Sequence, residues 1–304
     1  MPAHRATVII NPIAGPGRSR TIDSCATLAR SVLRARGFDA DVRVTGGPDD
    51  AHRFAAEALR DGTDLVIAWG GDGTVNGAGA ALAGSRTPLG IIGGGSGNGL
   101  ARELGLPLDP AAALEVAATG ATRAIDAGEL NGSLFFNVAG IGLDACIAGR
   151  LAAANARRGL LGYVLATLAE MPAYKPCEYS VVMSDLDAAD RWAPLRTHAL
   201  FIAIANSRQY GQGAQIAPLA SLDDGVMDIV VVKPQSLFRI ASRLPAFFRG
   251  TLREDDTVLM RTASNVDITS TTPIRFHVDG EPREAATTLA LRTRPRDLLI
   301  RVRH

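Results

Sequence analysis

The sequence predicts an α/β protein of two domains: an N-terminal α/β domain built on a parallel sheet and a C-terminal domain rich in antiparallel strands. The chain has 304 residues, and at about 150 residues per domain this length accommodates two domains. With 47% hydrophobic and 21% charged residues, both domains can bury a core, which excludes a disordered or fibrous chain. The pattern changes near residue 126, where alternating strand-like and helix-like segments give way to mostly strands.

The N-terminal elements are predicted from short β-branched or aliphatic runs beside Gly, Pro or Asp, with helical stretches between them. Strands are expected at 6–11, 39–45, 64–69 and 88–92, and helices at 19–36, 49–60 and 74–82. This alternation favours a parallel sheet with helices on both faces. Ligands of such sheets bind at the carboxyl ends of the strands, where loops 11–18, 70–74 and 93–98 are rich in glycine.

The second half reads as an antiparallel sheet. An Asn131-Gly132 turn predicts a hairpin over 129–142, and an Ala- and Leu-rich stretch predicts a helix over 147–170. Further strands are expected at 179–183, 198–206, 227–233, 265–269, 274–278, 289–293 and 298–302.

Composition excludes several classes of protein. A net charge of +1 gives no reason to expect a nucleic-acid partner. Three scattered cysteines (Cys25, Cys146, Cys177) suit neither a disulfide framework nor a zinc site and fit a reducing cytoplasm. No apolar run reaches the roughly 18 residues of a membrane span, and a strand from residue 6 leaves no room for a signal peptide.

The usual phosphate-binding motifs are also absent. The chain has 30 arginines but only two lysines, Lys175 and Lys233, and neither follows a glycine, so a Walker A loop is excluded. There is no G-x-G-x-x-G run and no protein-kinase signature. Any nucleotide chemistry must therefore use backbone amides, arginine and magnesium.

Residues 69–76, W-G-G-D-G-T-V-N, follow a predicted strand and open a predicted helix. The glycines allow the backbone to approach a phosphate closely, and the amides of Gly73 and Thr74 are expected at a helix N-terminus, a natural anion site. Asp72 would repel a phosphate, so its expected role is to bridge a metal ion or to accept a proton. A second glycine loop at 93–99 offers Ser96 and Asn98 as hydrogen-bonding groups, and a third lies at 11–18.

These motifs occur in the order N-P-x-x-G, G-G-D-G-T-x-N and G-S-G-N-G-L-A-R, followed by F-N-V-A-G-I-G-L-D-A at 136–145, Asn206-Ser207, L-D-D-G at 222–225 and D-G-E at 279–281. The series resembles the diacylglycerol kinase catalytic family, which includes bacterial lipid kinases, sphingosine kinases and ceramide kinases. The likeness covers essentially the whole chain.

The resemblance implies an α/β nucleotide-binding domain at 1–126 and a β-rich lipid domain at 127–294, with a last strand at about 295–304 returning to the first domain and ATP in the cleft between them. It implies transfer of the γ-phosphate of ATP, with magnesium, to a hydroxyl of a diacylglycerol-like or sphingoid or ceramide lipid. An NAD-kinase-like enzyme and a non-catalytic nucleotide- or lipid-binding relative stay open as alternatives, as does the identity of the lipid.

Site residues follow from the same resemblance. The positions matching ATP contacts are Asn11, Pro12, Ile13, Ala14, Gly15, Arg18, Thr45, Gly70, Gly71, Asp72, Gly73, Thr74, Val75, Asn76 and Ser96. Magnesium would be held by Asp224 and by the carbonyls of Ser221 and Val226, because this ion prefers oxygen ligands. Glu281 is the expected proton acceptor with Asp279 in support, and Asp72 stays open for the same role. His277 is expected to be a core or face residue of its strand.

Two positions depart from the family pattern. Gly77 stands where a glutamate is usual, which would remove a carboxylate near the site, and Gly93-Gly94 stand where a proline is frequent, which would loosen the second glycine loop.

Residues 236–253 predict the contact with the lipid surface. Leu237, Ile240, Ala241, Leu244 and Phe248 recur at helical spacing. Arg239 and Arg243 share a face, as do Arg249 and Arg253, while Pro245 is expected to split the segment into two short helices. Basic amphipathic helices rest on anionic membranes, so a cytoplasmic protein in peripheral contact with the inner face of the membrane is expected. Whether the chain forms a homodimer stays open.

Overall fold

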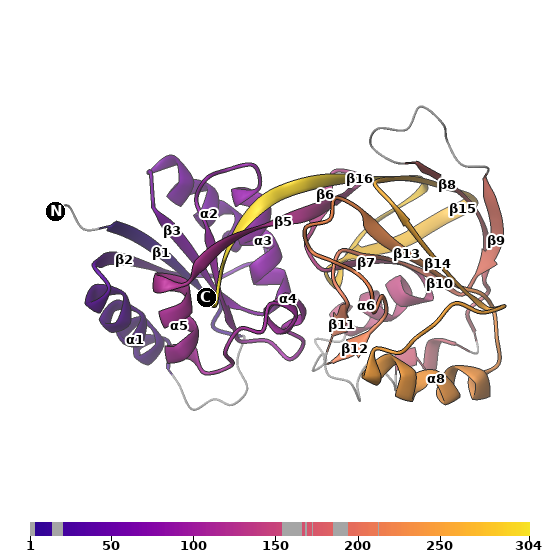
Figure 1. Cartoon of the computed structure of the whole chain (residues 1–304), viewed down its shortest axis with the longest axis horizontal. Helices are drawn as coiled ribbons and strands as arrows, with labels where there is room; N and C mark the ends of the chain where they lie inside the picture. The colour runs from indigo at the N-terminus through magenta and orange to yellow at the C-terminus, as the bar shows by residue number, and fades with distance from the viewer. Residues whose placement is uncertain are drawn as a thin grey trace. The chain divides into compact units, whose positions relative to one another are not determined.

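The computed structural model describes residues 4–13, 21–153, 166–167, 169–171, 173–184, 194–211 and 213–304. The chain divides into two compact units, Met1–Ile125 with Arg296–His304 and Asp126–Pro295. Each unit limit lies one residue from the expected domain limit. Strands β5 (Ala121–Leu130) and β16 (Glu281–Val302) contain residues of both units, so the chain passes between the units along these two strands (Figure 1).

Unit 1 contains the predicted parallel sheet. Its strands are β1 (His4–Ile10), β2 (Phe38–Val44), β3 (Leu65–Gly70) and β4 (Leu89–Gly93), in the order β4-β3-β1-β2. All of these pairs are parallel, and the end of β16 joins β4, also in parallel, where Ile300 lies opposite Leu89. Every residue of β3 is buried, as expected for a central strand covered on both faces.

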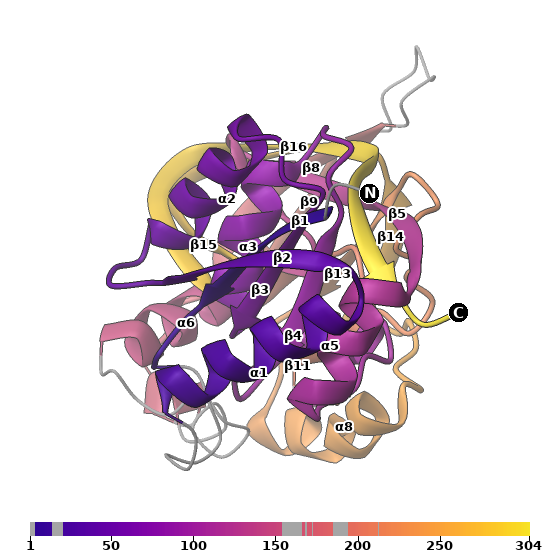
Figure 2. The same ribbon diagram turned by 90° about the vertical axis from the view of Figure 1, so that its left-hand side faces the viewer.

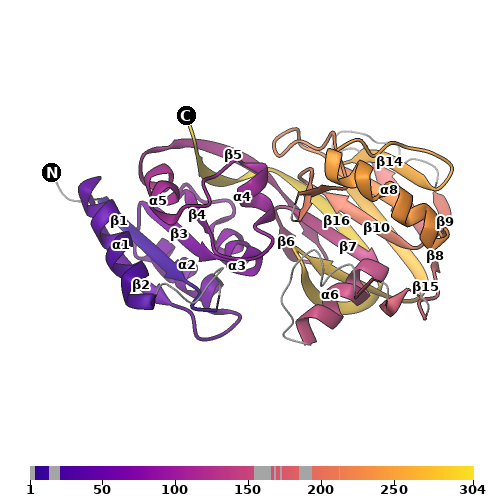
Figure 3. The same cartoon turned by 90° about the horizontal axis from the view of Figure 1, so that it is seen from below.

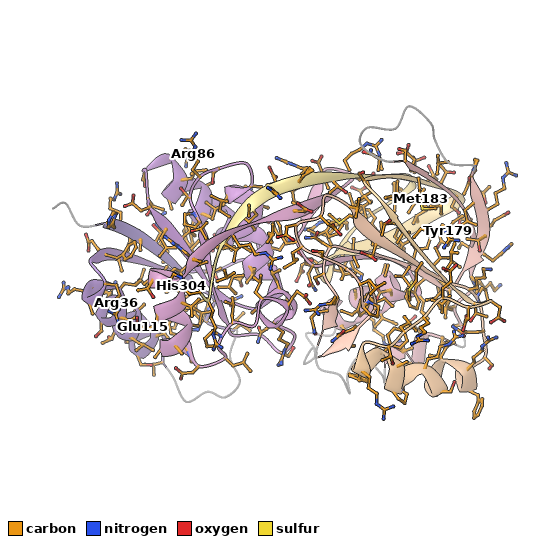
Figure 4. The ribbon with its side chains drawn as sticks, in the orientation of Figure 1. Arg36, Arg86, Glu115, Tyr179, Met183 and His304 are labelled. Carbon is orange, nitrogen blue, oxygen red and sulfur yellow. The ribbon has the colours of Figure 1, made fainter. Side chains whose placement is uncertain are left out.

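Helices cover both faces of this sheet (Figure 2). The helices of unit 1 are α1 (Ile22–Ala35), α2 (Asp50–Arg60), α3 (Asp72–Leu82), α4 (Gly99–Glu103) and α5 (Pro110–Thr119). Helix α1 packs against α5, and α2 packs against α3. Arg36, at the end of α1, forms a 2.8 Å ion pair with Glu115 of α5, and the two side chains lie together in Figure 4.

Gly77 does not open space beside the glycine loops. It lies on α3 facing α2, and a Cβ atom at this position would be 3.3 Å from both the Cβ of Ala51 and the amide nitrogen of His52. The effect of the missing glutamate on the site stays a prediction. The absent side chain lets two helices approach each other closely.

Unit 2 is built on an antiparallel sheet in the order β14-β13-β10-β7-β15-β16, with β8 pairing β15 and β9 pairing β8. Its strands other than β5 and β16 are β6 (Ser133–Phe135), β7 (Val138–Gly142), β8 (Cys177–Ser184), β9 (Leu195–Ala199), β10 (Phe201–Ala205), β11 (Gln209–Gly211), β12 (Ala214–Gln215), β13 (Met227–Val232), β14 (Val258–Ala263) and β15 (Asn265–Val278). The predicted Asn131-Gly132 hairpin is confirmed between β5 and β6. Tyr179 and Met183 of β8 point into the main core of this unit (Figure 4).

Three expected elements of unit 2 differ from the structure. The strand predicted at 198–206 is interrupted at Leu200, because its two parts have different partners: β9 pairs with β8, whereas β10 pairs with β7 and β13. The helix predicted at 147–170 begins earlier, as α6 (Leu143–Ala153), and residues 154–165 lie outside the described residues.

The third difference is Pro245, which does not split its helix. A single helix, α8 (Leu237–Arg249), continues through it, and Figure 3 shows α8 lying along unit 2. Both ends are fixed, because the Ser236 hydroxyl accepts a hydrogen bond from the Arg239 amide and Gly250 ends the helix in the left-handed conformation. A proline removes only one intrahelical hydrogen bond. No helix in the described part of the chain has the length and apolar character needed to cross a membrane.

Candidate functional site

The three glycine-rich loops of unit 1 are joined at the carboxyl ends of β1, β3 and β4. The Asn11 amide donates to the carbonyl of Trp69 at 2.9 Å, and its side-chain Nδ2 donates to the Thr74 hydroxyl at 3.1 Å. The amide of Gly94 donates to the carbonyl of Gly70 at 2.8 Å. The sequence therefore placed these loops correctly at one edge of a parallel sheet.

The Asp72 carboxylate connects the two most glycine-rich loops. Its Oδ2 accepts from the Asn98 amide at 3.0 Å and its Oδ1 accepts from the Gly99 amide at 2.7 Å. Asp72 begins α3, and the two amides begin α4, so the side chain of one helix start caps the next helix.

The glycines allow this contact by removing side-chain volume between the loops. A Cβ on Gly95 would lie 2.7 Å from the Cα of Gly71, and a Cβ on Gly97 would lie 2.6 Å from the Asp72 Oδ2. Asn98 adopts a left-handed conformation and exchanges two 2.8 Å hydrogen bonds with the backbone of Gly95. The loop backbone is therefore tied to its neighbour, and the expected loosening by Gly93-Gly94 stays a prediction.

The start of α3 differs in one detail from the expected anion site. The Thr74 amide already donates to the Gly71 carbonyl at 3.0 Å, because the first turn is tightened. The amide of Gly73 stays within the first turn, where helix amides point outward and the helix dipole favours an anion.

The remaining nucleotide candidates fall into three groups. Pro12, Ile13 and Ser96 are exposed on the loops. The Thr45 amide donates to the Ile10 carbonyl at 2.9 Å, which places Thr45 beside the end of β1. The side chains of Val75 and Asn76 are buried, so they are placed to support α3 from within. Ala14, Gly15 and Arg18 lie outside the described residues.

The D-G-E segment of unit 2 forms the tight turn between β15 and β16. Asp279 and Gly280 both have positive φ, at 48° and 82°, the signature of a two-residue hairpin. The Asp279 carboxylate accepts three hydrogen bonds of 3.0 Å from the consecutive amides of residues 136–138. Asp279 thus holds the turn in place, while Glu281, the first residue of β16, is half-buried.

The L-D-D-G segment brings carboxylates together around Asp126, a fully buried residue of β5. Asp126 Oδ2 accepts from the Gly225 amide at 2.7 Å. Burial raises the pKa of Asp228 to about 6, and the charge of Asp224 adds to the effect. The pKa of Asp224 is likewise raised, first by burial and then by Asp126 and Asp223. Sequence reasoning missed Asp126 and Asp228, because they belong to no motif and only the fold brings them to this segment.

The donor set at this segment is chemically suited to magnesium. Asp224, the carbonyls of Ser221 and Val226 and the nearby carboxylates are all oxygen donors, and destabilised carboxylates gain from a cation. Among the described residues, no three His, Cys, Asp or Glu side chains gather closely enough to hold a metal ion. Backbone carbonyls would therefore have to complete any coordination shell.

A pocket of about 400 Å³ lies against α6 and the β15–β16 hairpin. Its lining includes Arg150, Arg275 and Arg283 together with Pro282, the residue after Glu281. Among the described lining residues the only carboxylate is Glu170, which pairs with Arg150 at 2.5 Å. The pocket is therefore basic and is lined by residues adjacent to the D-G-E turn.

Comparison with known proteins assigns a family to each of the two units. Residues 5–130 match the family described as "Diacylglycerol kinase catalytic domain", and residues 137–302 match "YegS C-terminal NAD kinase beta sandwich-like domain". A diacylglycerol kinase of Mycobacterium tuberculosis (strain CDC 1551 / Oshkosh) is 34% identical over 283 residues, covering 91% of this chain and 88% of the relative. A Klebsiella pneumoniae (strain 342) protein named "Probable lipid kinase YegS-like" is 32% identical and covers 85% of both chains.

A solved structure supports the fold independently. The crystal structure of a diacylglycerol kinase from Bacillus anthracis str. Sterne matches with a TM-score of 0.73 at 22% identity and covers 99% of this chain and 98% of its own.

Asp72→Asn is expected to destabilise unit 1 as well as to weaken nucleotide binding, because an amide group cannot accept hydrogen bonds at both positions. One charge-assisted hydrogen bond is worth about 1.5–3 kcal/mol, so the unfolding temperature should fall by several degrees. The measurement is thermal unfolding together with titration of an ATP analogue. Gly97→Ala disturbs the same contact while keeping the negative charge of Asp72. It should also lower both the unfolding temperature and the affinity for the ATP analogue. An unchanged unfolding temperature in both variants would contradict the bridging role.

Asp228→Asn is expected to raise the unfolding temperature at about pH 7.5. Because the pKa of Asp228 is raised from 3.8 to about 6, the folded protein binds a proton more tightly than the unfolded chain, and stability falls as pH rises through that interval. The increase in unfolding temperature caused by Asp228→Asn should therefore become smaller as the pH falls below about 5. Unfolding temperatures measured across this range test it, and a gain independent of pH would count against the assignment.

Proposed function

The chain belongs to the diacylglycerol kinase family of lipid kinases, and from this premise we propose that it transfers the γ-phosphate of ATP to a lipid hydroxyl with the help of Mg²⁺. The observation that carries the proposal is the Asp72 bridge, which holds two glycine loops and two helix starts together at the ligand-binding edge of a parallel sheet. This edge is where open α/β sheets bind ligands.

The nucleotide phosphates are proposed to lie against backbone rather than lysine. Helix starts such as that of α3 bind anions through first-turn amides and the helix dipole, and Gly71 and Gly95 approach so closely that no side chain fits between the two loop backbones. The exposed Ser96 hydroxyl adds a hydrogen-bonding group. This arrangement suits a chain in which no lysine follows a glycine.

Magnesium is proposed to be held by Asp224 with the carbonyls of Ser221 and Val226, within the negative field of Asp126 and Asp228. When bound, the ion neutralises charge during phosphoryl transfer. The raised pKa values of Asp224 and Asp228 support the choice of this segment, because ionised carboxylates crowded in this way are stabilised by a cation.

The acceptor hydroxyl is proposed to lose its proton to Glu281. This residue follows a turn that is held by three hydrogen bonds to Asp279, and a rigidly placed carboxylate is what proton removal in phosphoryl transfer to an alcohol requires. The basic pocket beside the same hairpin is proposed to receive the polar headgroup of the lipid, with Arg275 and Arg283 favouring headgroup oxygens.

Glu281→Gln is expected to lower kcat by about 100- to 10,000-fold with little change in ATP affinity, because removing a general base slows the chemical step. Turnover is measured with ATP, Mg²⁺ and diacylglycerol, ceramide, sphingosine or NAD in parallel, with chelation of Mg²⁺ as the control. Transfer to a lipid but not to NAD supports the proposal. Transfer to NAD alone would overturn it, and an unchanged kcat with weakened ATP binding would move Glu281 to the nucleotide site.

Helix α8 is proposed to contact the cytoplasmic face of the membrane through its apolar edge. Phe238 is 85% exposed, and Leu244 and Phe248 are also exposed, whereas Ile240 and Phe247 pack inward. Arg239 and Arg243, expected to face the lipid, are instead paired with Asp256 and Asp255. Aromatic side chains on an amphipathic helix insert at the interface, so the exposed apolar residues are the stronger candidates.

Phe238→Ser with Phe248→Ser is expected to weaken binding to anionic vesicles by about tenfold or more. The double variant loses the two aromatic side chains that are proposed to insert into the membrane. The matched control, Arg239→Gln with Arg243→Gln, should change vesicle binding much less. Sedimentation with vesicles measures both, and turnover on a short-chain acceptor reports on the intact active site. Equal binding by the phenylalanine variant and the parent would exclude α8 as the membrane contact.

A further inference from the structure

A buried pair of side chains lies directly behind the D-G-E turn. His277 Nε2 and Asp144 Oδ2 are 2.6 Å apart, with side-chain exposures of 6% and 3%. His277 stands near the end of β15, two residues before the turn, and Asp144 is the second residue of α6. The pair therefore joins α6 to the hairpin.

The hydrogen bonds of His277 define the position of its proton. The Gly280 amide donates to Nδ1 at 3.2 Å, so Nδ1 presents a lone pair and the proton of the neutral ring is on Nε2. Nε2–H then donates to the Asp144 carboxylate. This links the amide of the turn to a buried carboxylate through the two sides of one imidazole ring.

Space for the pair is reserved in the neighbouring strand. Gly140 of β7 lies opposite His277 in the sheet. A Cβ atom on Gly140 would lie 1.8 Å from the Asp144 Oδ2 and 2.3 Å from the His277 Nε2. Any other residue at position 140 would displace the pair, so the sheet is built around it.

The turn is held from a second direction by the Asp279 carboxylate on the amides of residues 136–138. Two independent sets of hydrogen bonds thus fix the two turn residues: one holds the side chain of Asp279, the other holds the amide of Gly280. Glu281 is the next residue and pairs with Val278 across the turn, so its backbone continues directly from the anchored residues.

We propose that His277 is a positioning residue that orients the turn so that Glu281 faces the acceptor hydroxyl, and that Asp144 fixes the tautomer of its ring. The inference rests on the proposed role of Glu281. Apolar side chains would fill the same volume without the cost of burying polar groups, but they could not hold the amide of Gly280. Misplacing a catalytic group by about 1 Å can cost about 100-fold in rate.

Two substitutions of His277 separate the two hydrogen bonds. In His277→Asn, the amide oxygen takes the place of Nδ1 and keeps the Gly280 bond while the Asp144 bond is lost. In His277→Gln, the amide nitrogen takes the place of Nε2 and keeps the Asp144 bond while the Gly280 bond is lost. Losing a hydrogen bond to a buried carboxylate destabilises more than losing one between neutral groups, so the Asn variant should have the lower unfolding temperature.

The proposal predicts the opposite order for activity. His277→Gln should lower kcat by about 10- to 100-fold with the KM for ATP changed by less than about twofold, whereas His277→Asn should retain more activity despite its lower stability. Assays are run well below both unfolding temperatures. Activity that follows stability would show a merely structural role and overturn the proposal.

Further variants guard against misfolding and identify which proposal fails. Asp144→Asn keeps an acceptor for Nε2–H and should stay within about threefold of the parent in kcat. Ile204→Ala in the core of unit 2 is the stability control and should keep its kcat. Adding His277→Gln to Glu281→Gln should cause no further loss of kcat if His277 acts through Glu281. Additive losses would overturn the positioning role, whereas a Glu281→Gln variant with full activity would instead overturn the proposed base.

Discussion

The hydrogen bonds between the Asp72 carboxylate and the amides of Asn98 and Gly99 are the constraint on which the arrangement of the glycine loops of unit 1 depends. They fix the starts of α3 and α4 relative to each other, and the glycines around them exist because the loops approach to backbone contact. A carboxylate among phosphate-binding loops is electrostatically unfavourable for an anion, so its presence is explained by what it holds together. Two helix starts and two loop backbones are thereby held together at one edge of the sheet, where the proposed phosphate contacts lie.

Unit 2 uses the same device at the D-G-E turn. The Asp279 carboxylate receives three amides of one loop, and the His277 ring receives the amide of Gly280. In both units, a buried or half-buried acceptor satisfies backbone donors that would otherwise be costly to bury. The positive φ angles reverse the direction of the chain at the turn, and the carboxylate hydrogen bonds hold the turn in place. Precise placement of reacting groups thus rests on backbone hydrogen bonding rather than on large side chains.

Local sequence signals predicted much of the fold and of the glycine loops. The features that were not predicted depend on contacts between residues far apart in the sequence. The parallel sheet and the Asn131-Gly132 hairpin follow from strand runs and turn residues. Helix α5 was missed because its Ala-rich sequence shows little periodicity, although Asp109 caps it and Pro110 opens it. The interruption at Leu200 depends on which strands lie alongside, and no motif includes Asp126 or Asp228. The glycine loops were located correctly, but the contact of Gly77 with α2 requires the packed helices.

The geometry bears on which carboxylate removes the proton of the acceptor. Asp72 and Asp279 both carry their charge against backbone amides, with two and three hydrogen bonds respectively. Turning either side chain toward a substrate would leave those amides without their acceptor, at a cost of about 1–3 kcal/mol for each buried donor. Glu281 follows the turn that those bonds hold and pairs with Val278 across it. This cost favours Asp72 and Asp279 as fixed anchors, which agrees with the proposal that Glu281 removes the proton of the hydroxyl.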